Sequence, residues 1–172
     1  MSGAATPERP GTGRAAVWLA EQHEAESVAG LLVEFRDWLG RSWPSANAFH
    51  AGVERLIERP DTEYLIGAAD EDSPPSGVCQ LRYRFGVWTA AEEMSLEDLF
   101  VREDARRSGL GAALVEAALG RARARGCRAV ELDTNAANGA ARALYGRFGF
   151  SSESEEFGGD DLLLRLRLPD AE

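Results

Sequence analysis

Lysine is absent from this chain of 172 residues, and all 19 of its cationic side chains are arginines. They are outnumbered by 29 carboxylates, which gives a formal net charge of −10. This balance disfavours a protein that binds nucleic acid or an anionic membrane over its whole surface, because both partners attract positive charge. The lack of lysine also excludes the phosphate-binding loop Gly-x-x-x-x-Gly-Lys-Ser/Thr.

Cysteine is scarce, and long apolar runs are missing. Cys79 and Cys127 are too few for a disulfide framework and lack the companion ligands of a zinc site. Both lie in apolar, strand-like runs, which predicts buried positions. The longest early apolar run, 15–20, is far shorter than the ~18 residues that span a bilayer, and no signal peptide precedes it. We therefore expect a cytoplasmic protein that binds neither a metal nor a membrane.

The remaining composition fits one globular domain. Hydrophobic residues make up 44% of the chain, which is enough for a core, and the length suits a single domain. Residues 1–13 contain two prolines and three glycines and predict a flexible N-terminal tail. The domain is expected over 14–168, followed by a short acidic end at 169–172.

Hydrophobic periodicity predicts the element order β-α-α-β-β-β-α-β-α-β. The predicted strands cover 15–20, 63–69, 77–85, 94–101, 129–132 and 162–168. The predicted helices carry their apolar stripes over 28–39, 49–57, 110–122 and 141–148, with Asn138 as the cap of the last one. Hairpin-like pairs in the middle and strand–helix–strand units at the end predict an α/β fold. We expect a mixed, largely antiparallel, twisted sheet with helices on both faces.

The segment 106–112, with the sequence Arg-Arg-Ser-Gly-Leu-Gly-Ala, lies between a predicted strand and a predicted helix. The first N–H groups of a helix have no partner inside it, and the helix dipole adds positive charge there. Gly109 and Gly111 have no Cβ to keep a phosphate away from this backbone. Arg106 and Arg107 add guanidinium groups that suit phosphate oxygens. The segment predicts an anion-binding turn; a glycine-softened turn with solvated arginines is the alternative.

The spacing Arg106-x-x-Gly109-x-Gly111 resembles the pyrophosphate-binding motif of the GNAT superfamily of N-acetyltransferases, which use acetyl-CoA. The run Leu-Glu-Asp-Leu-Phe-Val at 96–101 resembles the fourth strand of this family. The run at 143–150 resembles its late helix with a Gly-Phe ending. The resemblance covers about 94–150. It implies the transfer of an acetyl group from acetyl-CoA to a primary amine of a small molecule, a polyamine-like compound or a protein.

The resemblance also implies how the donor is held. Main-chain N–H groups of 106–112 would bind the pyrophosphate, although Arg107 stands where many members of the family have glycine. The backbone of 99–101 would pair with the pantetheine arm as if it were an added strand, and Asn138 would bind near the thioester. The expected donor-binding residues are Leu99, Phe100, Val101, Arg106, Arg107, Ser108, Gly109, Leu110, Gly111, Ala112 and Asn138.

Glu97 and Tyr145 are the predicted catalytic residues. An acceptor amine with a pKa of roughly 10.4 is almost wholly protonated at pH 7, and a carboxylate that takes its proton makes it a nucleophile. Glu97 resembles a strand glutamate that serves as this base in several family members. Asp98 is the second candidate, but on a regular strand it faces the opposite side unless a bulge intervenes. Tyr145 would protonate the leaving thiolate; its alternative role is a core aromatic.

Three alternatives stay open. The same scaffold can use another acyl-CoA or acceptor, or it can be a CoA-binding regulatory module without catalysis. A nucleic-acid binder is supported only by the seven arginines of 102–128, which have no interleaved aromatics. The joint presence of Glu97 and Tyr145 favours an enzyme. The acidic balance outside 102–128 favours a cationic acceptor, and the resemblance leaves a homodimer open.

Overall fold

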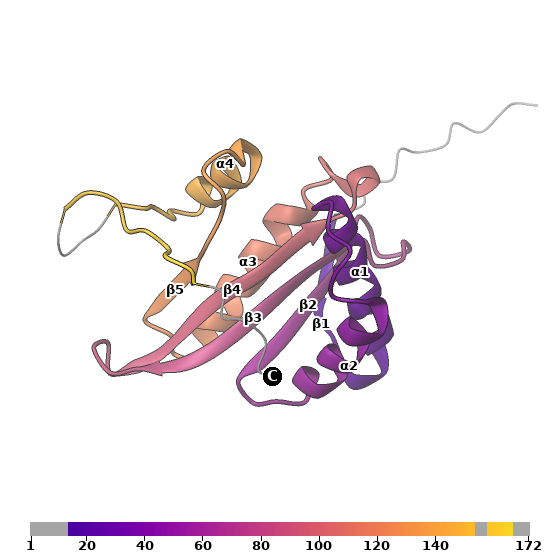
Figure 1. Ribbon diagram of the computed structural model, residues 1–172, viewed down its shortest axis with the longest axis horizontal. Coiled ribbons are helices and arrows are strands. Elements are labelled where there is room, and N and C mark those ends of the chain that lie inside the picture. The colour runs from indigo at the N-terminus through magenta and orange to yellow at the C-terminus, as the bar shows by residue number, and fades with distance from the viewer. Residues whose placement is uncertain (1–13, 154–157, 167–172) are drawn as a thin grey trace, which may run out of the picture.

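The structure is a computed structural model that describes residues 14–153 and 158–166. Within these residues five strands form one sheet in the order β1-β2-β3-β4-β5 (Figure 1). The first four strands are antiparallel and β5 is parallel to β4, as expected for a mixed, largely antiparallel sheet. The strands are β1 (Ala16–Leu19), β2 (Thr62–Ala68), β3 (Gly77–Gly86), β4 (Ala91–Val101) and β5 (Ala129–Leu132).

Helices cover both faces of the sheet, and each begins where the sequence supplies a cap or a turn. α1 and α2 lie on one face and α3 lies on the other, while α4 lies above β5 in the view of Figure 1. The Ser45 hydroxyl accepts a hydrogen bond from the Ala48 N–H at 3.2 Å and starts α2. The described α-helices are α1 (Ala25–Trp38), α2 (Ala46–Ile57), α3 (Leu110–Ala124) and α4 (Gly139–Arg147).

The sheet separates two apolar layers, because alternate residues of each strand point to opposite faces. Between the sheet and α1 and α2 lie Val28, Leu31, Val53, Tyr64, Ile66, Val78 and Phe100. Between the sheet and α3 lie Leu65, Cys79, Leu81, Met94, Leu110, Leu114 and Ala118. Since β2 is buried along its whole length, it forms the centre of the domain.

Two glycines allow Leu110, the first residue of α3, to pack closely against the sheet. Gly67 of β2 and Gly77 of β3 are partners in the ladder. A Cβ on Gly67 would lie 2.8 Å from the Leu110 Cδ1 atom, and one on Gly77 would lie 3.0 Å from the Leu110 Cδ2 atom. Real Cβ atoms do not approach so closely without displacing a neighbour. The two glycines therefore determine how close the first turn of α3 lies to the sheet.

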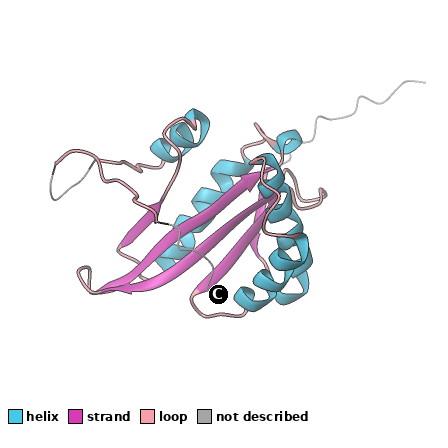
Figure 2. Cartoon of the chain, viewed as in Figure 1, coloured by secondary structure: helices cyan, strands magenta, loops and turns pink. Residues whose placement is uncertain are grey.

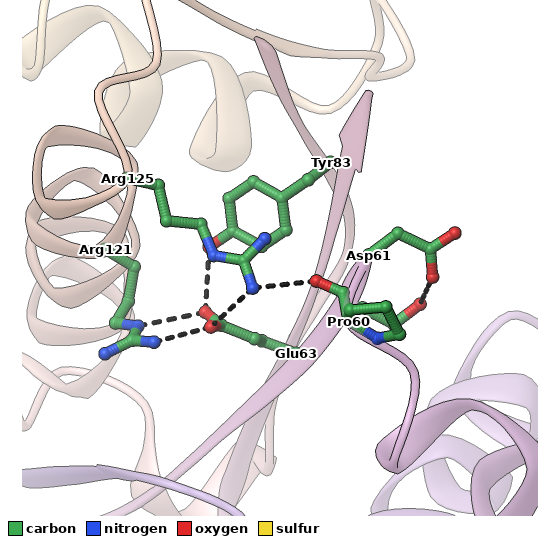
Figure 3. A network of polar contacts seen from close by, with 7 residues as sticks. Pro60, Asp61, Glu63, Tyr83, Arg121 and Arg125 are labelled. Carbon is green, nitrogen blue, oxygen red and sulfur yellow. Dashed lines mark hydrogen bonds and ion pairs between the residues drawn. The ribbon is translucent and has the colours of Figure 1, made fainter. Parts of the chain in front are cut away.

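The C-terminal end of α3 is held by a buried carboxylate (Figure 3). Glu63 of β2 accepts hydrogen bonds from Arg121 Nε at 2.9 Å and from the Tyr83 hydroxyl at 2.8 Å, and Arg125 Nη2 lies 3.4 Å away. The Arg125 guanidinium also lies 3.8 Å from the centre of the Tyr83 ring. Burial would raise the pKa of Glu63, but the hydrogen bonds and the arginine charges lower it below its ordinary value.

One predicted element is wrong over the described residues. Residues 162–166 form no strand, and an isolated bridge between Glu153 and Asp160 is the pairing in this region. The predicted strand residues 167–168 lie outside the described residues. The alternation of leucine and arginine fits one face of a strand, but a strand also needs a neighbour that accepts its hydrogen bonds. The leucines at 162, 163, 164 and 166 are accordingly exposed.

The predictions for the cysteines and the chain ends have different outcomes. Cys79 is buried as predicted, whereas Cys127 is half-buried in the loop before β5 rather than in a strand. The expected tail at 1–13 and acidic end at 169–172 lie outside the described residues. Across 14–153 and 158–166, no helix combines the length and the apolar character needed to cross a membrane.

Replacement of Glu63 tests the network at the end of α3. Glu63→Gln should lower the free energy of unfolding by about 2 kcal/mol at pH 7, because it leaves half-buried arginine charge without a counter-charge. Because the pKa of Glu63 is lowered, its stabilisation is present above the ordinary glutamate pKa and is lost as the pH falls through the folded value. Urea denaturation should therefore show a difference between the two proteins that shrinks on acidification. Glu116→Gln, at an exposed position of α3, is the control and should change little. A Glu63 variant as stable as the wild type would contradict the role of the network.

Candidate functional site

The short strand β5 runs beside only the first half of β4 (Figure 2). Their pairing begins at Glu93 and Ala129 and ends at Leu96 and Leu132. Beyond this point β4 continues to Val101 and pairs with β3 alone among the described strands. The edge of β4 that faces β5 therefore offers main-chain groups to an extended ligand.

A β-bulge lies where the two strands part. Gln80 of β3 pairs with Asp98, but the next residue, Leu81, pairs with Leu96, so that Glu97 is the extra residue of β4. The Gln80 side-chain amide donates a hydrogen bond of 2.7 Å to the Glu97 carboxylate. Glu97 and Asp98 therefore lie on the same face as Gln80. The regular alternation, which would place them on opposite faces, does not hold here.

Tyr64, Gln80 and Asp98 form one row across three strands, because each is the ladder partner of the next. The row lies on the face of α1 and α2, where the Tyr64 ring is buried. Only 1% of Tyr64 is exposed, and its hydroxyl has no hydrogen-bond partner in the described part of the chain. Burial raises the pKa of Tyr64 to about 12, and the charge of Asp98 adds to this. Tyr64 is therefore a neutral hydroxyl beside two carboxylates.

The proton affinities of Glu97 and Asp98 are both raised. Burial is the main cause of the raised pKa of Glu97; the positive charge of Arg82 opposes it, and the charges of Asp98 and Asp133 add to it. Burial also raises the pKa of Asp98, with a further contribution from Asp133. A carboxylate whose pKa moves towards neutrality is a better proton acceptor, which is common at catalytic sites.

Tyr145 of α4 lies on the other side of the gap between the strands. It is 8% exposed, its ring meets Phe150 edge-on at 5.9 Å, and its hydroxyl has no hydrogen-bond partner within the described residues. Burial raises its pKa to about 12, with smaller contributions from Cys79 and Asp133. Asp133 follows the last residue of β5 and acts on Glu97, Asp98 and Tyr145 alike. The charge of Asp133 therefore reaches all three groups.

The turn before α3 has the free N–H groups that the sequence predicts. Leu110 donates to the Ser108 hydroxyl at 3.3 Å. In the described part of the chain, five other amides of the turn have no partner, namely those of Arg107, Ser108, Gly109, Gly111 and Ala112. Arg107 and Gly109 adopt left-handed conformations, with φ of 65° and 84°. Such a turn directs successive N–H groups towards an anion at the positive end of a helix dipole.

Side chains fix this turn against the rest of the domain. Arg106 Nε donates to the Val101 carbonyl at 3.1 Å, and its guanidinium lies 5.0 Å from the centre of the Trp38 ring. The Ser108 hydroxyl donates to the Ala105 carbonyl at 2.6 Å. A pocket of about 540 Å³ beside Gly109 leaves room for a ligand larger than one phosphate.

Asn138 has a structural role in addition to any binding role. Its side-chain oxygen accepts a hydrogen bond from the Ala141 N–H at 3.1 Å and caps α4, as the sequence predicts. Its side-chain NH₂ group is therefore the part that remains for a ligand. Whether the expected donor-binding residues hold a donor stays a prediction; the structure places the open edge of 99–101 before the turn at 106–112 in the chain.

Three residues of the site, namely Tyr64, Gln80 and Asp133, were not identified from the sequence. Tyr64 and Gln80 join it through strand register, which no short motif encodes. Asp133 had a usable signal, because it directly follows a predicted strand, and the carboxyl ends of parallel strands share one edge of a sheet.

Comparisons with known proteins agree on the family. Residues 32–150 match the model of the acetyltransferase (GNAT) family. The uncharacterized N-acetyltransferase YhfO of Bacillus subtilis (strain 168) is 28% identical over 135 residues, which cover 78% of this chain and 89% of that protein. The structure of a putative acetyltransferase from Arthrobacter sp. FB24 has a TM-score of 0.77 at 26% identity, with 97% of this chain and 99% of that chain covered.

A structure that contains CoA has the same fold. The aminoglycoside N-acetyltransferase AAC(6')-Iy in complex with CoA has a TM-score of 0.72 at 19% identity, with 93% of this chain and 99% of that chain covered. The family match spans more than half of the present chain and includes β4, the turn before α3 and α4. Together with the mixed sheet, it establishes that the chain belongs to the GNAT family of acetyltransferases and is an acyltransferase.

Proposed function

We propose that this acyltransferase moves an acetyl group from acetyl-CoA to a primary amine by direct attack on the thioester. The observation that carries the proposal is the open edge of β4 that leads to a turn with five free N–H groups. An extended arm with a diphosphate at one end matches this arrangement. The thioester at its other end would then lie where Glu97, Asp98 and Tyr145 meet.

The donor would be held mainly by the backbone. Amides of the 106–112 turn donate to pyrophosphate oxygens, where the dipole of α3 adds positive charge. The main chain of 99–101 pairs with the pantetheine arm, and the Asn138 NH₂ group donates near the thioester. Arg107 serves through its N–H group, and its φ of 65° accounts for the preference for glycine at this position of the family motif.

Glu97 would act as the base. It removes a proton from the ammonium group of the acceptor, and the free amine then forms a bond to the thioester carbon. The negative charge that develops on the carbonyl oxygen is stabilised by a main-chain N–H near Leu99. The raised pKa of Glu97 supports this assignment, because it brings the carboxylate closer to the proton affinity that a base needs.

Tyr145 would act as the acid. When the bond between carbon and sulfur breaks, the thiolate takes the phenolic proton and leaves as CoA thiol. The tyrosinate then recovers a proton from the positively charged nitrogen of the new amide. Because burial raises the pKa of Tyr145 to about 12, the phenol keeps its proton at neutral pH and can donate it when negative charge develops on the sulfur. No covalent intermediate with the enzyme is needed, and the burial of Cys79 raises the pKa of its thiol, which suits an inert residue.

The acceptor would be a small-molecule or peptide amine, and the reaction would take place in the cytoplasm. The two cysteines are free, which agrees with a reducing compartment. Because the chain has no lysine, no side chain of its own is a primary amine that competes with an added acceptor.

Binding and turnover test the proposal together. Acetyl-CoA should bind in isothermal titration calorimetry, and amines from a library should release CoA thiol above the rate without acceptor. Gly109→Val should weaken acetyl-CoA binding at least tenfold, because its left-handed conformation and the close approach of a phosphate both exclude a β-branched side chain. Gly120→Val, at an open position of the same helix, is the matched control. CoA binding without thiol release for any amine would favour a regulatory module instead.

Removal of the Tyr145 hydroxyl tests the acid. Tyr145→Phe should lower kcat about 100-fold and leave acetyl-CoA affinity nearly unchanged, because the ring remains and only the proton donor is lost. Tyr83→Phe removes a hydroxyl of the Glu63 network and is the control: it should reduce stability but not kcat. Wild-type turnover by the Tyr145 variant would refute the assignment.

The pH dependence of kcat/KM tests the base. Activity should rise with pH as Glu97 loses its proton, with the midpoint above the ordinary glutamate pKa. Glu97→Gln should remove this rise. Asp98→Asn should move it to lower pH, since the charge of Asp98 raises the pKa of Glu97, and Asp133→Asn should act in the same direction. A profile unaffected by Glu97→Gln would assign the proton transfer to another group.

A further inference from the structure

One half-buried arginine of β3, Arg82, has no partner among the residues that the structure describes. Among the described residues five arginine side chains are half-buried: Arg36, Arg82, Arg102, Arg121 and Arg125. Four of them pair with a carboxylate, namely Asp37, Glu34 or Glu63. Arg82 makes neither an ion pair nor a side-chain hydrogen bond to any described residue.

The isolation of Arg82 is unexpected in this protein. A half-buried charge loses hydration and normally regains the energy from a partner. Carboxylates outnumber arginines by 29 to 19, so potential partners are abundant. The nearby Asp61 is already bound by Arg59 through hydrogen bonds of 2.9 and 2.8 Å and by the Thr62 hydroxyl at 3.1 Å. The guanidinium of Arg82 is thus left for a ligand.

Arg82 lies on the same face of the sheet as the proposed base, Glu97. It lies two residues after Gln80 on β3, on the same face and about 7 Å further along the strand. Its own row, Thr62, Arg82 and Ser95, adjoins the row of Tyr64, Gln80 and Asp98. Its positive charge lowers the pKa of both Glu97 and Tyr64, which places the guanidinium near both.

We propose that Arg82 binds a carboxylate of the acceptor, so that the acceptor is an amino-acid-like compound with its amine at Glu97 and its carboxylate at Arg82. The inference deepens the proposed acetyl transfer and rests on it. A guanidinium binds a carboxylate through two parallel hydrogen bonds, which would fix the direction of the amine. A phosphate fits the same fork, but its second negative charge would be repelled by Glu97 and Asp98.

This acceptor differs from the one that the overall charge favours. An acidic protein attracts cationic molecules, and a polyamine would satisfy Glu97, Asp98 and Asp133. Its second ammonium group, however, would lie beside the unpaired charge of Arg82. Because electrostatic energy depends on distance, the local guanidinium outweighs the average charge of the surface. Polyamines are therefore expected to be poor acceptors.

Matched acceptors test the inference. Thiol release is measured with amino acids, with the corresponding α-carboxamides and aminoalkylphosphonates, and with linear diamines. Rates are compared as pH-independent kcat/KM, because a carboxamide lowers the pKa of its amine. The wild type should favour each carboxylate over its amide at least tenfold, through KM, because the charged hydrogen bonds are lost.

Variants assign the preference to Arg82. Arg82→Gln should reduce the ratio to about 1 with the KM for acetyl-CoA unchanged, and Arg82→Lys should retain part of it. Arg84→Gln is the matched control, because Arg84 lies two residues along the same strand and already pairs with Glu93 and Glu131. An unchanged ratio in Arg82→Gln, or a wild type that prefers amides or diamines, would overturn the inference. A preference for phosphonates would reassign the site to phosphate.

The outcomes separate this inference from the proposed function. Acetylation of amines without a carboxylate preference overturns the role of Arg82 and leaves acetyl transfer intact. If no amine releases thiol, acetyl transfer fails, and binding decides the role of Arg82. In that case an amino acid should raise the Tm of the CoA complex in the wild type but not in Arg82→Gln. Equal shifts in both proteins, or none in either, would overturn it.

Discussion

The extra residue of β4 is the constraint on which the site depends. A strand that kept its alternation would point Glu97 and Asp98 to opposite faces and would continue its parallel pairing with β5. The bulge shifts the alternation of side chains by one residue, so both carboxylates lie on the same face of the sheet. The pairing with β5 ends at the residue before it, and the edge of β4 opens from there to Val101. The open edge of β4 and the placement of Glu97 and Asp98 on one face therefore both result from the bulge.

The two ends of this path carry opposite electrostatic character. At the turn before α3, free N–H groups and the helix dipole favour an anion. Near Glu97, Asp98 and Asp133, accumulated negative charge favours a cation, and the protons of Glu97 and Asp98 are harder to remove than usual. A donor with an anionic tail and an uncharged acyl end suits this gradient in one orientation. The proposed acceptor, zwitterionic rather than simply cationic, suits the mixture of carboxylates and Arg82 at the acyl end.

Local features of the sequence were sufficient for most of the fold. Apolar periodicity located the helices and the first five strands, and the spacing of Gly109 and Gly111 located the turn before α3. Long-range features were not predictable from it. The bulge at Glu97 depends on register with Gln80, and the row with Tyr64 depends on a third strand. The leucines of 162–166 have a strand-like pattern, but pattern alone does not provide a neighbouring strand.

The glycine pair of β2 and β3 connects the core to the ligand site. Leu110 occupies the hollow above Gly67 and Gly77, and the free amides precede or follow it by three residues at most. The position of these amides relative to the sheet therefore depends on Gly67 and Gly77, because a methyl group at either position would displace Leu110. A residue of the core can thus affect the proposed binding of the donor without any contact with it. The packing of the domain interior therefore constrains the position of the turn before α3.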